Sequence, residues 1–155
     1  LSLNFLEHQF IRQQDQAEKT FDEPRIHMAL VCAAKSCPPL RPEAYTGTRL
    51  ERQLQDQARR FANQSAYVRY DATEQRLYLS PILKWYAADF GGETGVLNFL
   101  FPLIESPTTQ AGVRAAREGQ AQIVYNAYDW SLNTQGKTVG VNRSSGFGSG
   151  SIPNE

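Results

Sequence analysis

The chain lacks most of the features that would assign a sequence to a broad functional class at once. Its 16 basic side chains are balanced by 16 acidic ones, so no excess charge points to nucleic acid or to an anionic membrane. No apolar run approaches the roughly 20 residues that a membrane-spanning helix needs. We therefore expect no nucleic-acid partner and no membrane span.

Cysteine is also scarce. The two cysteines among 155 residues are too few to indicate the redox compartment. No internal repeat is present, and no signal peptide opens the chain. Because the chain begins with Leu1 rather than methionine, we expect a product whose leader has been removed, in the periplasm or outside the cell.

What the sequence does contain is the composition of one soluble globular domain. Hydrophobic residues make up 41% of the chain and charged residues 21%. This length and composition predict a single domain over residues 1–133. Glycine, serine and asparagine dominate from Thr134 onward, so residues 134–155 are predicted to form a Gly/Ser-rich C-terminal tail.

Signals for helix starts recur along the chain. Thr48 and Glu51 form a capping box, and Ser80 and Ser106 are each followed by a proline, which is typical of the first turn of a helix. Apolar residues follow these starts at helical spacing. Helices are therefore predicted to begin near Ser2, Thr48, Ser80, Thr94 and Ser106.

Short apolar runs predict strands between these helices. Arg25–Cys32 is predicted to be a buried strand, because it is rich in β-branched and long apolar residues and is too short for a typical helix. Ala66–Tyr70 and Arg76–Leu79 flank a polar connection and predict a hairpin, and Gln122–Tyr125 is a last strand. The predicted fold class is α+β, with a small antiparallel sheet covered by several helices.

Both cysteines and one of the two histidines lie within Pro24–Arg41, the stretch around which we expect the chain to be organised. The two prolines after Cys37 end the strand and suit the first turn of a helix. Cys37 is therefore predicted at a strand-to-turn corner, where backbone N–H groups and the nearby Lys35 and Arg41 would favour its thiolate. His27 on the strand would supply a base, and Cys37 a nucleophile.

Plainer interpretations of the same residues stay open. Cys37 is a reactive thiol, one half of a local disulfide with Cys32, or a small packed side chain. His27 is a base or a hydrogen-bonded structural histidine, and Glu7 and His8 are site residues or solvated residues of a helix surface. Zinc held by the two cysteines and two histidines has suitable ligand types but no recognised spacing, so we predict no metal and no cofactor.

Four stretches, in the same order along the chain, are similar to those of a known family. They are Leu3–Arg12 with its Glu-His pair followed by an Arg, Pro24–Arg41 with Ser-Cys-Pro-Pro, Leu79–Gly91 with Trp-Tyr-x2-Asp-Phe-Gly, and Tyr128–Asn133 with Tyr-Asp-Trp-Ser-Leu-Asn. With these motifs the chain resembles domain-of-unknown-function family 547, which occurs in bacteria and plants. The resemblance implies a thiol-hydrolase architecture of papain-like or transglutaminase-like type.

The resemblance also implies roles for particular residues. Cys37, His27 and the pair of Glu7 and His8 match motif positions of the family. Family members carry a helical segment upstream of the position of Leu1, with an Asn-x-Tyr-Asn-Ala motif, which we expect to be missing from this chain. That segment, or a separate protein, is a candidate partner that would complete a wall of the site.

The predicted function is thiol-dependent acyl transfer by a peptidase, amidase or transferase with a Cys-His pair. Cys37 would attack a carbonyl group, and His27 would take the thiol proton and return it to the leaving group. Glu7 or His8 would orient His27 and stabilise its charged form. A peptide or another amide-type small substrate would suit this chemistry, and the sequence does not choose among them.

The alternative function is a non-enzymatic protein-interaction module. In this hypothesis Cys32 and Cys37 form a disulfide or simply pack, and exposed aromatic side chains around Trp85 and Trp130 contact a protein partner. The two hypotheses differ in thiol chemistry. The enzyme hypothesis predicts that Cys37 is alkylated near neutral pH much faster than Cys32.

Large apolar side chains at helical spacing are predicted to lie mainly in the core: Leu54, Phe61, Trp85 and Leu97. A tryptophan at such a position is more often a core residue than a platform for substrate. Replacement of Trp85 by alanine is therefore expected to cost several kcal/mol, on the order of 3–5.

Overall fold

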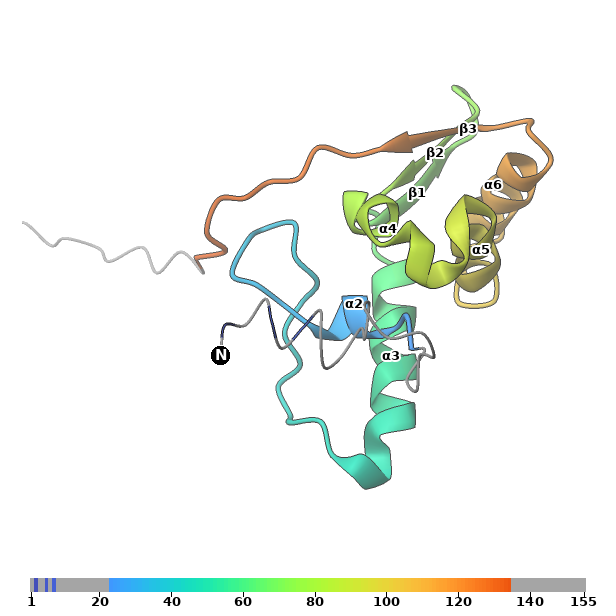
Figure 1. Ribbon diagram of the computed structural model, residues 1–155. Coiled ribbons are helices and arrows are strands. Elements are labelled where there is room, and N and C mark those ends of the chain that lie inside the picture. Colours follow the sequence, from blue (N-terminus) through green and yellow to red (C-terminus); the bar gives the residue numbers. More distant parts are fainter. Residues whose placement is uncertain (1, 3–4, 6, 8–22, 135–155) are drawn as a thin grey trace, which may run out of the picture.

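The computed structural model describes Ser2, Phe5, Glu7 and residues 23–134. In chain order the regular elements are α2 (Ile26–Ala29), the 3₁₀ helix η2 (Gly47–Arg49), α3 (Leu50–Ala62), β1 (Val68–Asp71), β2 (Arg76–Leu79), α4 (Pro81–Trp85), the 3₁₀ helix η3 (Ala87–Phe90), α5 (Gly92–Leu100), α6 (Pro107–Arg117) and β3 (Gln122–Tyr125). Helices and one small sheet together confirm the predicted α+β class (Figure 1). Most of the helix predicted from Ser2 and nearly all of the predicted tail lie outside the described residues. None of the helices in the described part is long and apolar enough to cross a membrane.

The sheet has three strands in the order β1-β2-β3. β1 and β2 are antiparallel, with Val68 opposite Leu79, and form the predicted hairpin. β2 and β3 are parallel, with Leu79 beside Tyr125, so the prediction of an antiparallel sheet is wrong for this pair. The physical reason is the connection, because α4, η3, α5 and α6 lie between β2 and β3 and return the chain to the same end of the sheet.

The prediction of a strand over Arg25–Cys32 is wrong. Ile26–Ala29 forms the single helical turn α2, which packs against α3, and no helix or strand covers Leu30–Cys32. Three consecutive side chains of α2 are buried, whereas in a strand successive side chains point to opposite faces. For a buried apolar run of this length, the sequence pattern is the same in a strand and in a helical turn. Tertiary packing therefore decides which of the two structures forms.

The helix starts that rest on a serine followed by a proline are confirmed. The side chains of Ser80 and Ser106 each accept a hydrogen bond from a backbone N–H in the first turn of α4 and α6. The capping box predicted at Thr48 is wrong, because η2 leads directly into α3 and no side chain caps that helix. α5 begins at Gly92, slightly before the predicted start near Thr94.

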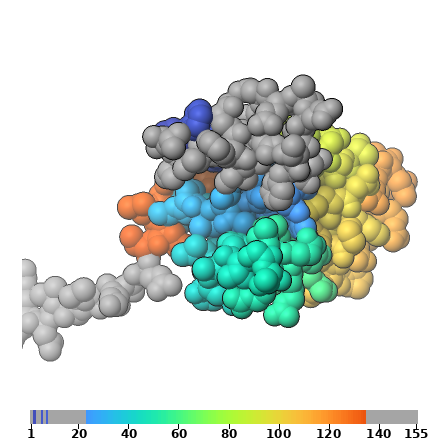
Figure 2. Space-filling model, turned by 60° about the horizontal axis from the view of Figure 1, so that its bottom comes forward, coloured from blue at the N-terminus to red at the C-terminus, as the bar shows by residue number. Residues whose placement is uncertain are grey.

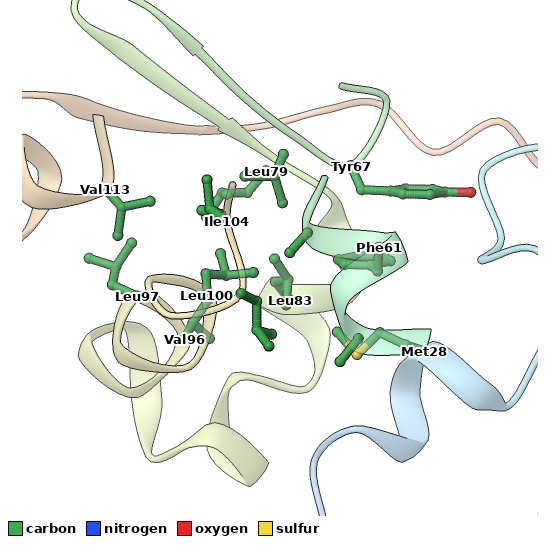
Figure 3. Close-up of a cluster of buried hydrophobic side chains, with 14 of the residues drawn as sticks. Met28, Phe61, Tyr67, Leu79, Leu83, Val96, Leu97, Leu100, Ile104 and Val113 are labelled. Carbon is green, nitrogen blue, oxygen red and sulfur yellow. The ribbon is translucent and has the colours of Figure 1, made fainter. Parts of the chain in front are cut away.

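The core lies between the sheet, α3 and the helices that connect β2 to β3 (Figure 3). Apolar side chains from all of these elements form one cluster, which includes Met28, Phe61, Leu77, Leu79, Leu83, Val96, Leu97, Leu100, Ile104 and Val113. The predicted core residues Leu54, Phe61 and Leu97 are buried, but Trp85 is 49% exposed. The prediction for Trp85 is therefore wrong, since α4 buries its first three residues instead.

Two segments with little regular structure lie beside this core. Residues 30–46, named here the cysteine loop, follow α2, and residues 126–134, named the C-terminal arm, follow β3. Figure 1 shows both segments extending to the same side of the molecule, and Figure 2 shows them adjacent at the surface. A single antiparallel bridge between Ala34 and Leu132 joins them.

Candidate active site

A cavity of about 530 Å³ opens between the cysteine loop, α4 and the C-terminal arm. His27, Cys32 and Cys37 all line it, so the structure brings the predicted base and both thiols to one place. Glu7 lines the same cavity, whereas His8 lies outside the described residues. The remaining lining residues of the described chain are apolar or aromatic side chains, among them Trp85, Tyr86, Tyr128 and Trp130.

Backbone hydrogen bonds tie the cysteine loop to the C-terminal arm. The N–H of Lys35 donates to the carbonyl of Ser131 (3.0 Å), and the N–H of Asn133 donates to the carbonyl of Ala33 (2.7 Å). The hydroxyl of Ser36 accepts a hydrogen bond from a backbone N–H of the arm (2.9 Å). These bonds satisfy backbone N–H and C=O groups of the loop that would otherwise lack a partner within the protein. They also place the aromatic residues of the C-terminal arm beside the cysteines.

Side chains of the folded core fix the other side of the loop. The hydroxyl of Tyr67 donates to the carbonyl of Cys37 (2.9 Å), and Figure 3 shows this ring reaching out of the core toward the loop. From α3, the buried amide of Gln57 donates to the carbonyl of Pro39 (2.6 Å). Cys37 is therefore held by polar contacts from residues that lie well after it in the sequence.

His27 is buried on α2 and has a carboxylate partner. Its Nε2 lies 2.9 Å from Oδ2 of Asp89, which η3 carries, and the two side chains are 1% and 11% exposed. The imidazole stacks on the ring of Tyr86 at 3.9 Å between centroids. Such a carboxylate fixes the orientation of an imidazole and favours its charged form.

Asp89 was absent from the site residues that the sequence predicted. The sequence suggested Glu7 or His8 as the orienting group, and Glu7 accepts a hydrogen bond from the hydroxyl of Tyr86 (3.3 Å). No local pattern could have linked Asp89 to His27, because the two residues are 62 positions apart. Its one signal was its place in the motif Trp-Tyr-x2-Asp-Phe-Gly.

Both cysteines are free thiols, but their surroundings differ. Cys37 is buried with 7% exposure, and Cys32 is exposed. The backbone N–H of Cys32 donates to Sγ of Cys37 (2.7 Å). Sγ of Cys32 in turn lies 3.6 Å from the hydroxyl of Tyr128.

The predicted activation of Cys37 by its corner is wrong. Burial raises the pKa of the Cys37 thiol, although the N–H of Cys32 works in the opposite direction. The cations that the sequence placed nearby have other partners: Lys35 pairs with Asp129 at 3.9 Å, and Arg41 pairs with carboxylates of its own. No helix begins at Cys37, so no helix dipole favours its thiolate.

Cys32 has the more acidic thiol of the two. Burial works against its ionisation, but hydrogen bonds from the Ala34 backbone and the Cys37 thiol outweigh that effect. A further hydrogen bond from Tyr128 helps to hold the pKa of Cys32 below its ordinary value. The expected order of alkylation is therefore reversed, with Cys32 ahead of Cys37.

Three aromatic side chains stand at the mouth of the cavity. The ring of Tyr128 lies 5.0 Å from that of Trp85 and 4.4 Å from that of Trp130. Trp130 is 69% exposed. Burial and the neighbouring thiols raise the pKa of Tyr128 far above its usual value, so its hydroxyl stays protonated and can donate a hydrogen bond into the cavity.

The described residues offer no metal centre. Among them, no group of three or more histidine, cysteine, aspartate or glutamate side chains is arranged to hold a metal ion. The zinc hypothesis from the sequence included His8, which lies outside that part of the chain.

In comparisons with known proteins, one family model matches part of the chain. The family described as "Protein of unknown function, DUF547" matches residues 1–62, a range that includes Glu7, His27 and both cysteines. The motif stretches at Leu79–Gly91 and Tyr128–Asn133 lie beyond this match. No curated protein matches the chain, and no solved structure does. Residues 1–62 are thus similar to the family that the sequence motifs suggested.

Proposed function

We propose that this protein is a thiol-dependent acyl-transfer enzyme with Cys37 as nucleophile. The observation that carries the proposal is the buried pair of His27 and Asp89, 2.9 Å apart, whose imidazole lines the same cavity as Cys37. A thiol, an imidazole and a carboxylate that orients the imidazole are the three parts of a cysteine hydrolase site.

The raised pKa of Cys37 determines how such a site would work. Because the thiol keeps its proton at neutral pH, attack on a carbonyl carbon requires a base in the same step. His27 takes that proton, and Asp89 stabilises the resulting imidazolium. The imidazolium then protonates the leaving amine or alcohol, which leaves a thioester on Cys37. Water or an acceptor amine attacks the thioester and frees the thiol.

A hydrogen-bond donor is also needed for the oxyanion that forms during attack. The backbone N–H of Cys37 already donates to the carbonyl of Ala34 (3.1 Å). Tyr128 keeps its hydroxyl proton and lines the cavity, and its hydroxyl would turn from Sγ of Cys32, 3.6 Å away, to the oxyanion. Tyr128 is therefore our candidate for stabilising the oxyanion.

The cavity lining favours an uncharged acyl group. Leu30, Val31 and Ile82 supply aliphatic walls, and the described lining residues include no lysine or arginine that would attract an anion. A peptide, isopeptide or other amide with an apolar acyl side fits these walls. A papain-like or transglutaminase-like hydrolase architecture is part of the same proposal.

The proposal is tested by trapping the acyl-enzyme with p-nitrophenyl acetate. Wild-type protein should release a burst of nitrophenolate and gain one acetyl group, located on Cys37 by peptide mass mapping. Cys37→Ser should abolish the burst, and the matched variant Cys32→Ser should keep it. Acetylation of neither cysteine, or equal acetylation of both, contradicts the proposal, provided that the variants melt at the wild-type temperature.

A second candidate function, a protein-interaction module, is favoured by one observation. Trp85 and Trp130 are 49% and 69% exposed, and their rings are 5.8 Å apart. Exposed tryptophans in contact with each other are typical of binding surfaces. Under this function, Trp130→Ala would abolish binding to a protein partner, whereas Cys37→Ser would leave binding unchanged.

A further inference from the structure

Acyl transfer at this cavity uses one thiol, yet the cavity holds two. Cys32 and Cys37 both line it and both are free. The backbone N–H of Cys32 donates to Sγ of Cys37 at 2.7 Å. The sulfur of Cys37 therefore already lies against the residue that carries the other thiol.

The turn between the two cysteines is held in the shape that keeps them together. The N–H of Cys37 donates to the carbonyl of Ala34 (3.1 Å), and Ala34 is bridged to Leu132 of the C-terminal arm. Tyr67 holds the carbonyl of Cys37 from the core side. The turn thereby keeps Sγ of Cys37 beside Cys32, and a disulfide forms where side-chain rotation brings the two sulfurs to bonding distance.

The two thiols differ in their access to solvent. Cys32 is exposed, whereas Cys37 is 7% exposed. A dissolved oxidant therefore meets Cys32 first. The lowered pKa of Cys32 adds to this difference, because the thiolate is the species that reacts with oxidants.

We propose that Cys32 is a site of reversible oxidation by hydroperoxides, and that Cys37 resolves the oxidised form as an internal disulfide. This inference stands on the contact of the Cys37 sulfur with the Cys32 backbone and on the exposure of Cys32. It is independent of the acyl-transfer proposal.

The chemistry balances in two steps. The Cys32 thiolate attacks the O–O bond of the hydroperoxide, which yields a sulfenic acid on Cys32 and an alkoxide that takes up a proton to become an alcohol. Cys37 then attacks the sulfenic sulfur, the S–S bond forms, the S–O bond breaks, and hydroxide leaves as water with the proton of Cys37. Two thiols are oxidised by two electrons, and one hydroperoxide is reduced.

Such a disulfide has a direct consequence for the cavity. It removes the thiol of Cys37 from any acyl transfer, and a dithiol reductant restores it. A local disulfide within one loop also leaves the core unchanged, because none of the core cluster around Phe61 takes part.

The experiment uses hydrogen peroxide with the intact chain. In wild-type protein both thiols should disappear together, and the peptide that contains both cysteines should lose two hydrogens without forming a linked dimer. Dithiothreitol should restore both thiols. In Cys37→Ser, dimedone should trap a sulfenic acid on Cys32. In Cys32→Ser, loss of the Cys37 thiol should be at least about tenfold slower than in wild type, because Cys37 is buried and protonated.

Four results would overturn the inference: no oxidation of wild-type protein, disulfides between chains alone, a sulfinic acid on Cys32 beside an intact Cys37, or undiminished oxidation of Cys37 in Cys32→Ser. Peptide mapping of wild-type protein decides the first three without any variant. The acyl-enzyme test on reduced Cys32→Ser fails or succeeds separately, so the two proposals can be told apart.

Discussion

The core around the sheet and the cavity wall formed by the cysteine loop are stabilised by different interactions. In the core, Leu77, Leu79 and Leu83 are fully buried among apolar side chains from helices and strands. In the cavity wall, hydrogen bonds from Tyr67 and Gln57 hold backbone carbonyls of a loop. The first kind of interaction depends mainly on buried area, and the second on the direction of individual bonds. Changes in the core should therefore affect stability, and changes in the wall should affect the site.

The largest effect is expected in the core, at Phe61. Its ring is 1% exposed and stacks on Tyr67 at 4.5 Å between centroids. Phe61→Ala should lower the free energy of unfolding by about 3–5 kcal/mol, since it removes a large buried ring and leaves a cavity. Trp85→Ala, the matched aromatic change in the wall, should cost about 1 kcal/mol or less because Trp85 is 49% exposed. Urea denaturation measures both, and equal losses would contradict the contrast.

A smaller loss of stability is expected at the buried acid-base pair. Asp89→Ala removes the carboxylate that bonds to the buried imidazole of His27, and should cost about 1–3 kcal/mol. The control is Glu105→Gln, which breaks the exposed ion pair with Arg59 and should cost about 0.5 kcal/mol or less. If both variants unfold at the same urea concentration, the pair of His27 and Asp89 does not stabilise the fold.

The sequence predicted the core far better than the site, and the reason is physical. The β1–β2 hairpin, α3, α6 and β3 follow from local patterns of apolar residues, caps and prolines, and each of these elements formed within a few residues of its expected place. Phe61 on α3 and Leu97 on α5 lie in the core, as predicted.

The site depended on contacts between residues distant in sequence, which no local pattern records. Arg25–Cys32 has a composition that suits a strand, yet packing on α3 made its first half a helical turn. Asp89 reaches His27 across 62 positions. The surroundings of Cys37 were expected to lower its pKa, but its burial raises the pKa instead. The sequence did identify His27 and both cysteines as neighbours, because they lie within one short stretch.

A still smaller effect on stability should come from the hydroxyl that anchors the loop. Tyr67→Phe removes the hydrogen bond to the carbonyl of Cys37 and should cost about 1 kcal/mol. The informative readout is the site: iodoacetamide should label Cys37 faster, because the loop loses a fixed point. Tyr78→Phe, which removes a hydroxyl bonded to the exposed Glu74, should leave both stability and labelling unchanged. Unchanged labelling in Tyr67→Phe would show that the loop does not need this anchor.

The two thiols should differ in how their alkylation depends on pH. The pKa of Cys32 is lowered and that of Cys37 is raised. As the pH rises, labelling of Cys32 should therefore begin at a lower pH than labelling of Cys37. Near neutral pH we expect Cys32 to react on the order of tenfold faster than Cys37. Peptide mapping after brief treatment with iodoacetamide at several pH values measures both rates. Earlier labelling of Cys37 would reverse our assignment of the two environments.

We propose that His27 and Asp89 together activate Cys37. The most direct measurement is the rate at which p-nitrophenyl acetate acetylates Cys37 in wild type, His27→Gln and Asp89→Asn, with Glu105→Gln as the control. We expect a rate about 100-fold or more lower in His27→Gln, a reduction of at least about tenfold in Asp89→Asn, and no change in the control. Wild-type rates in both site variants, with wild-type melting temperatures, would contradict the claim.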